Sequence, residues 1–209
     1  MDKLDFEISG DIKNANKCLV FIHGWKGTKS SFKKIAQSFA IDRGVWILPQ
    51  APYLVEDQDI GYSWTHETSP GKYERKEPVR LLVNFFMDEI FSRFNSRDVF
   101  VFGFSQGGLV CYELIRILDK PLGGVFPIAG FMSSTKKGVQ RIHSAQINTP
   151  VIIGHGDSDD VILKKESELA YELLSKESNN ISLDIYKGGH KIGISYIKNI
   201  KELIENTDK

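Results

Sequence analysis

The stretch from Val99 to Gly108, which reads VFVFGFSQGG, decides the fold that we expect for this chain. Its first four residues alternate valine and phenylalanine, as is typical of a strand covered on both faces. Apolar residues then recur at helical spacing from Leu109 to Ile117. The pattern predicts a buried strand that runs into a helix through a G-x-S-x-G turn, the arrangement called a nucleophile elbow.

Ser105 stands at the centre of this turn and is the expected nucleophile. In such an elbow the serine lies on a tight, strained backbone, and side chains at Gly103 or Gly107 would collide where strand and helix cross. Glycine at both positions avoids the collision. A serine hydroxyl is a poor nucleophile at neutral pH, so the hypothesis also requires a base and a group that orients the base.

Composition limits the classes of protein to consider. The chain has 209 residues, 41% of them hydrophobic, which suits a single domain over residues 1–209 with a substantial core. Lys+Arg and Asp+Glu both number 27, so no overall field attracts nucleic acid or an anionic membrane. No stretch approaches the ~18 apolar residues of a membrane helix. We therefore expect a cytoplasmic protein with no nucleic-acid partner and no stable membrane insertion.

Apolar runs and helical periodicity alternate along the chain. Strands are expected at residues 4–9, 17–22, 45–48, 99–102, 123–130, 150–154 and 181–186, and helices near 32–39, 79–90, 109–117, 169–174 and 197–204. This alternation predicts an α/β sheet with helices on both faces. Residues 51–77 show no clear period and read as a long aromatic loop, and residues 131–146 as a polar loop with a helical turn. Cys18 and Cys111 are expected to be buried, reduced thiols.

The order of residues supplies a base and an acid after the serine. In open α/β sheets, sites form beyond the carboxyl ends of the strands. His190 follows the last expected strand. The two glycines directly before it let the loop place its imidazole over the elbow. Three candidate acids, Asp157, Asp159 and Asp160, follow the strand at 150–154, and spacing does not separate them. The order serine, acid, histidine is the one that α/β-hydrolases use.

The remaining requirement is a pair of N–H groups that stabilise an oxyanion. One is expected from the backbone of Gln106, at the start of a helix whose dipole favours negative charge. The backbone of Trp25, in the loop after the second strand, is the candidate for the other. His23, in the same loop, is expected to hold the loop by a hydrogen bond.

Several motifs together resemble the phospholipase/carboxylesterase family of α/β-hydrolases, which includes the acyl-protein thioesterases. They are FIHG at 21–24, PQAP at 49–52, GYSW at 61–64, GFSQGG at 103–108, HGDSD at 155–159 and GH at 189–190. The resemblance implies the α/β-hydrolase fold with a central, mostly parallel sheet, and no metal or organic cofactor. It also implies a triad of Ser105, Asp159 and His190, and so selects Asp159 among the three acids.

The chain departs from the family's pattern in three loops. The Gly-x-Gly-Asp pattern expected after His23 lacks its aspartate, the proline expected after the triad acid is Asp160, and Ser-Trp-Phe-Asp is replaced by SWTH at 63–66. These departures bear on the oxyanion loop, on the surroundings of Asp159 and on substrate preference.

Aromatic and apolar residues in the loops predict the substrate. Tyr53, Tyr62, Trp64, Phe131 and Met132 are expected to line an apolar acyl pocket. The function that follows is hydrolysis of carboxylic esters or thioesters with short to medium acyl chains, through an acyl-enzyme. A peptidase or a lysophospholipase on the same scaffold is the alternative, and a catalytically silent binding protein is a third. The sequence leaves open the oligomeric state and whether residues 51–77 form a lid.

Overall fold

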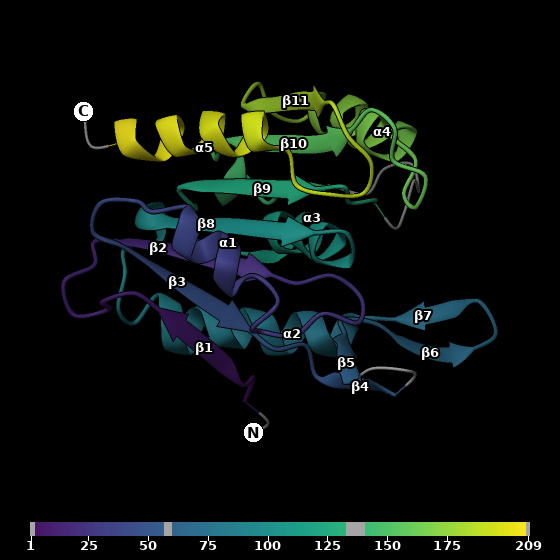
Figure 1. The fold of residues 1–209 in the computed structure, drawn as a ribbon, viewed down its shortest axis with the longest axis horizontal. Coiled ribbons are helices and arrows are strands. Elements are labelled where there is room, and N and C mark those ends of the chain that lie inside the picture. The colour runs from purple at the N-terminus through teal and green to yellow at the C-terminus, as the bar shows by residue number, and fades with distance from the viewer. Residues whose placement is uncertain (1–2, 57–59, 133–140, 208–209) are drawn as a thin grey trace.

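The computed structural model describes residues 3–56, 60–132 and 141–207, and within them a seven-stranded sheet forms the centre of the fold (Figure 1). Its strand order is β1-β3-β2-β8-β9-β10-β11. The edge strand β1 pairs antiparallel with β3, and the other neighbouring pairs are parallel. The bounds are β1 (Phe6–Ser9), β2 (Lys17–Ile22), β3 (Gly44–Pro49), β8 (Val99–Phe104), β9 (Gly124–Ile128), β10 (Val151–Gly156) and β11 (Ile181–Tyr186).

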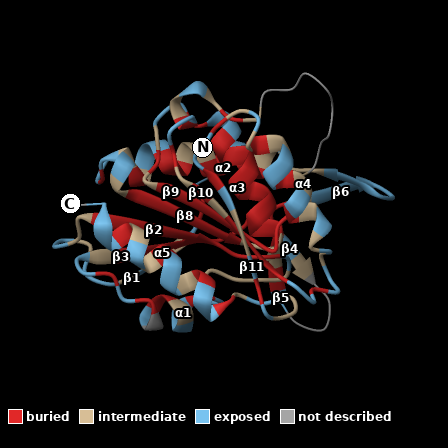
Figure 2. Ribbon diagram, turned by 90° about the horizontal axis from the view of Figure 1, so that it is seen from above, coloured by how far each residue is buried: buried red, intermediate tan, exposed pale blue. Residues whose placement is uncertain are grey.

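Helices cover both faces of this sheet (Figure 2). One core cluster joins the sheet to α2 (Lys76–Phe85), α3 (Gln106–Ile117) and α4 (Lys165–Leu174). A second cluster, on the opposite face, joins it to α1 (Lys33–Ser38) and α5 (Ile194–Asn206). The predicted α/β-hydrolase fold, a mostly parallel sheet with helices on both faces, is therefore confirmed.

The alternation of valine and phenylalanine in β8 divides its side chains between these two cores. Val99 and Val101 belong to the cluster beneath α3, whereas Phe100 and Phe102 belong to the cluster beneath α1 and α5. All four side chains are completely buried. The ring of Phe102 lies 4.8 Å from that of Phe126 and 5.2 Å from that of Trp46, between centroids. A strand buried on both faces explains the continuous apolar run that marked it in the sequence.

The prediction of an irregular loop over residues 51–77 is wrong. Strands β4 (Tyr53–Glu56) and β5 (Ile60–Ser63) form one antiparallel hairpin, and β6 (His66–Ser69) and β7 (Lys72–Glu74) form another. Both hairpins lie at the end of the molecule toward which the parallel strands point (Figure 1). Each is a two-stranded ribbon that buries little apolar surface, so the alternation of apolar and polar residues that marks a half-buried strand is weak.

Smaller differences concern the other segments. The helix expected at 79–90 consists of α2 followed by a π-helical turn, Phe86–Ile90. The helical turn expected within 131–146 is a 3-10 turn, Ser144–Gln146, while residues 133–140 lie outside the described residues.

Cys18 and Cys111 are free and buried. No helix in the described part of the chain has the length and apolar character needed to cross a bilayer.

The contact between β2 and α3 generates a prediction about stability. A Cβ atom on Gly107 would lie 2.1 Å from the backbone oxygen of Ile22, whereas one on Gly189 would meet its nearest neighbour at 3.7 Å. We expect Gly107→Ala to lower the free energy of unfolding by about 3 kcal/mol or more, because the backbone cannot give way there. Gly189→Ala, the matched control, should change it by less than about 0.5 kcal/mol. Urea denaturation measures both values, and equal losses would contradict this account.

Candidate active site

Ser105 occupies a strained turn between β8 and α3. Its backbone has φ 55° and ψ −115°, a conformation that costs a non-glycine residue about 1–3 kcal/mol. The amide of Ser105 donates to the Ile128 carbonyl at 2.8 Å, which ties the turn to β9. A Cβ atom on Gly103 would lie 2.2 Å from the Gly107 oxygen, so the strand and the helix meet where the sequence requires glycine. This geometry is the nucleophile elbow that the sequence predicts.

His190 and Asp159 meet beyond the ends of β10 and β11. The His190 Nδ1 atom lies 2.7 Å from Oδ2 of Asp159. Because a carboxylate only accepts, Nδ1 donates, and in the neutral ring Nε2 is left as the basic nitrogen. The loops that carry the pair are joined by backbone hydrogen bonds: the Asp157 amide donates to the Tyr186 carbonyl at 2.9 Å, and the Ser158 amide to the Gly188 carbonyl at 3.0 Å.

The Asp159 carboxylate is buried and fully hydrogen bonded. Its Oδ1 atom accepts from the amides of Val161 and Ile162, both at 2.9 Å. Burial acts to raise the pKa of this carboxyl, but the hydrogen bonds from His190 and from the two amides outweigh it, and the pKa lies below its usual range. Asp159 is therefore ionised at neutral pH.

The other two candidate acids take different positions. The Asp157 side chain is exposed and accepts from the Gly188 amide at 3.0 Å, and this hydrogen bond is the main cause of its lowered pKa. Asp160 is exposed as well. The structure thus brings Asp159, and neither neighbour, to His190.

His190 also lies beside the elbow. Its imidazole packs on the ring of Phe104, the residue before Ser105, with 4.7 Å between centroids. Within the described residues no hydrogen bond joins Ser105 to His190. Catalytic hydrogen bonds of this kind are often long until substrate is bound, so the arrangement is compatible with proton transfer from Ser105.

Both expected oxyanion donors border the elbow. Gln106 is the first residue of α3, where backbone N–H groups have no acceptor within the helix. The loop that carries Trp25 runs past Ser105, since a Cβ atom on Gly24 would lie 3.3 Å from that of Ser105. The Trp25 side chain is 60% exposed, with Lys26 Nζ 4.7 Å from its ring centroid. Its contribution to an oxyanion site would thus come from the backbone.

The Gln106 side chain holds the turn between the two hairpins. Its Oε1 atom accepts from the Trp64 amide at 2.8 Å, and its Nε2 atom donates to the hydroxyls of Ser63 and Thr65 at 3.0 and 2.8 Å. Trp64 is completely buried, and its indole N–H donates to the His23 carbonyl at 2.9 Å. The prediction that Trp64 lines the substrate pocket is wrong for this structure, because no part of its side chain is accessible.

His23 joins three loops at the edge of the site. Its Nδ1 atom donates to the Gly24 carbonyl at 2.8 Å, and its Nε2 atom accepts from the Ala51 amide and from Gln50 Nε2, both at 3.1 Å. Burial lowers the pKa of His23 to about 4, although the hydrogen bond to Gly24 opposes that shift. His23 is neutral at pH 7, and its hydrogen bonds are those of the loop-holding residue that the sequence predicts.

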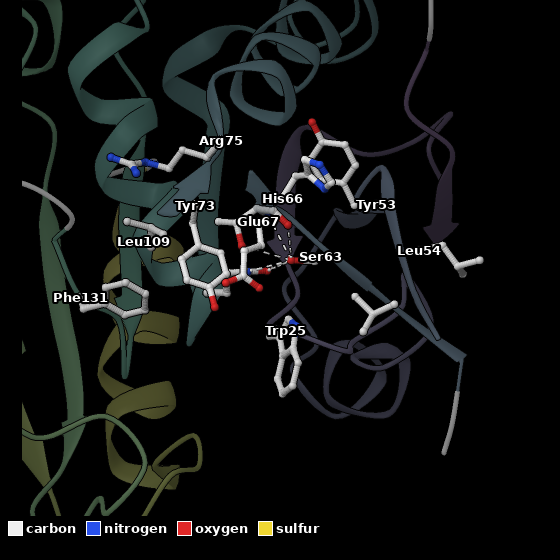
Figure 3. A pocket seen from close by; sticks show the side chains of 13 residues that line it. Trp25, Tyr53, Leu54, Ser63, His66, Glu67, Tyr73, Arg75, Leu109 and Phe131 are labelled. Carbon is white, nitrogen blue, oxygen red and sulfur yellow. Dashed lines mark hydrogen bonds between the residues drawn. The ribbon is translucent and has the colours of Figure 1, made fainter. Parts of the chain in front are cut away.

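A cavity of about 860 Å³ opens beside the elbow, between the hairpins and α3 (Figure 3). Leu109 and Phe131 lie on one side of it in that view, and Tyr53 and Leu54 on the other. Of the predicted pocket residues, Tyr53 and Phe131 line this cavity. Tyr62 and Met132 are partly buried and pack against the core beneath α3 instead. The full lining is Trp25, Tyr53, Leu54, Val55, Ser63, Thr65, His66, Glu67, Tyr73, Arg75, Gln106, Leu109 and Phe131.

Sequence reasoning predicted Tyr53 but missed the rest of the wall that the two hairpins supply. Leu54, Val55, His66, Glu67 and Tyr73 belong to strands that the apolar pattern did not reveal. Arg75, at the end of the second hairpin, donates to Glu113 of α3 at 2.8 Å and so fixes that wall to the elbow helix. In the part of the chain that the structure describes, no group of three or more His, Cys, Asp or Glu side chains could hold a metal ion.

Three features of the structure define the α/β-hydrolase class. They are a mostly parallel sheet, a strained serine at the start of a helix, and an Asp–His pair beyond the ends of β10 and β11. Within that class, the model of the phospholipase/carboxylesterase family matches residues 4–208, and the chain belongs to this family. Family and fold make it a hydrolase of the serine esterase type.

Individual relatives are distant but span most of the chain. Acyl-protein thioesterase 1 of Debaryomyces hansenii is 25% identical over 203 residues, covering 87% of this chain and 86% of the relative. A protein of Oryza sativa named "Probable inactive carboxylesterase" is 28% identical over 193 residues, covering 85% and 79%. The crystal structure of esterase PE8 superposes with a TM-score of 0.83 at 22% identity, covering 97% of this chain and 98% of that one.

The environment of His23 generates a prediction about pH. Its folded-state pKa of about 4 lies below the ordinary 6.5, so the unfolded chain binds more protons between these values. Stability from this group is complete above pH 6.5 and is lost as the pH falls toward 4, by up to about 3 kcal/mol. Between pH 7.5 and 4.5, urea denaturation should show that the free energy of unfolding falls less in His23→Asn than in the wild type. If it fell equally in both proteins, the lowered pKa of His23 would be contradicted.

Proposed function

We propose that residues 1–209 act as one hydrolase domain that cleaves carboxylic esters or thioesters through an acyl-enzyme on Ser105. The observation that carries the proposal is the Asp159–His190 pair, 2.7 Å apart, packed beside the elbow that presents Ser105. A basic imidazole nitrogen, a carboxylate that orients it and a serine on a strained turn are the parts that nucleophilic acyl transfer requires. The names of the relatives support ester or thioester bonds as the bonds cleaved.

In the first half of the proposed reaction, Nε2 of His190 takes the Ser105 proton while Oγ attacks the acyl carbonyl carbon. Asp159 holds the resulting imidazolium by its hydrogen bond to Nδ1. The carbonyl oxygen becomes an oxyanion, which accepts from the backbone amides of Gln106 and Trp25 and lies at the positive end of α3.

Collapse of this intermediate completes the reaction in two steps. His190 gives its proton to the leaving alcohol or thiol as the bond to the acyl carbon breaks. A water molecule then attacks the acyl-enzyme, with the same imidazole as its base, and the acid is released as Ser105 regains its proton. No further reactant is needed.

The cavity beside the elbow is the proposed acyl site. Its volume of about 860 Å³ is typical of a small-molecule pocket. Apolar side chains from α3, from the segment after β9 and from the first hairpin line it, among them Leu109, Phe131 and Val55. Such a wall suits an uncharged hydrocarbon chain of short to medium length better than the polar flanks of a peptide.

One relative bears on the silent alternative, because the name of the Oryza sativa protein describes it as inactive. In this chain, serine, aspartate and histidine are all present at positions 105, 159 and 190, and the last two form the expected hydrogen bond. That pair favours an active enzyme. Assays with peptides and lysophospholipids beside p-nitrophenyl esters separate the peptidase and lysophospholipase alternatives.

Removing the nucleophile tests the proposal. Ser105→Ala should lower kcat for p-nitrophenyl butyrate by roughly 10⁴-fold or more, because the acyl-enzyme cannot form. Ser63→Ala is the matched control: this serine also lines the cavity, but its hydroxyl bonds to the Gln106 side chain and to the Thr65 backbone, so the loss of kcat should be far smaller. Steady-state kinetics on folded protein decide the matter, and equal effects of the two substitutions would sink the proposal.

Narrowing the cavity tests the acyl site. Val55→Trp should lower kcat/KM for p-nitrophenyl octanoate by about tenfold or more, because the larger side chain blocks the cavity and removes apolar contacts with the acyl chain. For p-nitrophenyl acetate, kcat/KM should fall by less than about threefold. Ile60→Trp, on the paired strand but outside the cavity lining, is the control. If Val55→Trp lowered both rates alike, the acyl chain would have to bind elsewhere.

A further inference from the structure

A second histidine contacts the proposed triad acid from inside the protein. His155, in β10, is completely buried, and its Nε2 atom lies 3.3 Å from Oδ2 of Asp159, the oxygen that also binds His190. The same Nε2 lies 2.8 Å from the carbonyl of Ile162, and Nδ1 lies 2.6 Å from the hydroxyl of Ser167. The reaction described above assigns no task to this imidazole.

The partners of His155 determine where its proton lies. A carbonyl oxygen only accepts, so the Nε2 atom of His155 carries a proton and donates a hydrogen bond to the Ile162 carbonyl, with Oδ2 of Asp159 in contact at 3.3 Å. In the neutral ring, Nδ1 is then an acceptor, and the Ser167 hydroxyl donates to it. Ser167 is completely buried in α4 and thereby fixes both the orientation and the tautomer of the ring.

His155 closes the short loop that carries the acid. The Ile162 amide donates to Oδ1 of Asp159, and the Ile162 carbonyl accepts from His155. One residue of the loop is therefore held at its amide by the acid and at its carbonyl by the histidine. Loss of the imidazole would release the Ile162 carbonyl and remove the side chain that contacts Oδ2, and the carboxylate could then turn away from His190.

We propose that His155, held by Ser167, is a positioning residue that keeps Oδ2 of Asp159 directed at Nδ1 of His190. The inference rests on the proposed function, because it takes Asp159 and His190 as the catalytic pair. A carboxylate held in line stabilises the imidazolium of His190 more than one that can turn away. Removing His155 should therefore favour the neutral ring and lower kcat, with little effect on KM.

The other groups around Asp159 stay in place in the variants proposed below. Asp157 and Asp160 flank it in the loop, with Lys164 and Lys187 near Asp157. The Tyr186 phenol lies near Asp159. Its pKa is raised mainly by burial, and the negative charge of Asp159 adds to that rise. The Tyr112 phenol lies near Ser167, and burial raises its pKa while that hydroxyl opposes the rise. A change in the His190 titration therefore reports on its contact with Asp159.

The experiment compares His155→Leu, His155→Gln and Ser167→Ala with the wild type. Glutamine can still present an N–H group to the Ile162 carbonyl, so it is the conservative variant, and Ser167→Ala removes only the partner of Nδ1. Ser178→Ala is the matched control, because it removes another buried hydroxyl, one that donates to the Ile147 carbonyl at 2.6 Å away from the acid loop. NMR titration of the His190 imidazole is measured beside kcat and KM for p-nitrophenyl butyrate.

For His155→Leu we expect the His190 midpoint to fall by about 0.5 pH units or more and kcat to fall by about tenfold or more, with KM within about threefold. His155→Gln should restore most of both values, Ser167→Ala should shift them in the same direction by less, and Ser178→Ala should shift neither.

An unchanged or raised His190 midpoint in His155→Leu would overturn the proposal, as would equal losses in the leucine and glutamine variants. If His155→Leu does not fold, Ser167→Ala decides by the same criterion. Since the titration needs no substrate, inactivity of the wild type would refute the proposed function while leaving this test of His155 decisive.

Discussion

The site depends on the close approach of α3 to the strands beneath it. Where the helix crosses β2 and β8, the backbones leave no room for a Cβ atom at Gly103 or Gly107. This contact fixes the first turn of α3 and leaves Ser105 no relaxed conformation, so the residue remains at a positive φ. Strain of this kind persists only where the surrounding structure determines the backbone fully. The position of Ser105 at the tip of the turn and the free amide end of the helix both follow from it.

The parallel sheet then brings the acid and the base to the same edge. Strands β10 and β11 pair in register, so the loops that follow them leave the sheet side by side and bond to each other through Asp157 and Ser158. His190 and Asp159, 31 positions apart in the chain, thereby come within 2.7 Å. His155 extends the same arrangement into the core through Ser167 of α4. A chain of side-chain contacts thus runs from the buried Ser167 of α4, through His155 and Asp159, to the imidazole beside Ser105.

Much of this could be predicted from the sequence, because the central strands are buried on both faces and the elbow has a local signature. The position of the site could be predicted as well, because Ser105, the acid loop and His190 each follow an expected strand and so belong at the carboxyl ends of the sheet. Spacing could not choose among Asp157, Asp159 and Asp160, since their difference lies in backbone hydrogen bonds; the family resemblance selected Asp159. The hairpins were not predicted, because two-stranded ribbons bury little apolar surface and so show only a weak alternation of apolar and polar residues. Trp64 was misread for a related reason: an aromatic residue in a segment taken for a loop gives no local sign that its indole N–H is directed inward, toward the His23 carbonyl.

The central claim is that the Asp159–His190 pair activates Ser105, and covalent trapping tests it most directly. Folded protein is treated with a fluorophosphonate, which reacts with serines activated in this way, and the adduct is located by mass spectrometry of the digested chain. The account predicts one adduct per chain, on Ser105, with labelling strongly slowed in His190→Ala. An adduct on another residue, or no adduct on protein shown to be folded, would contradict it.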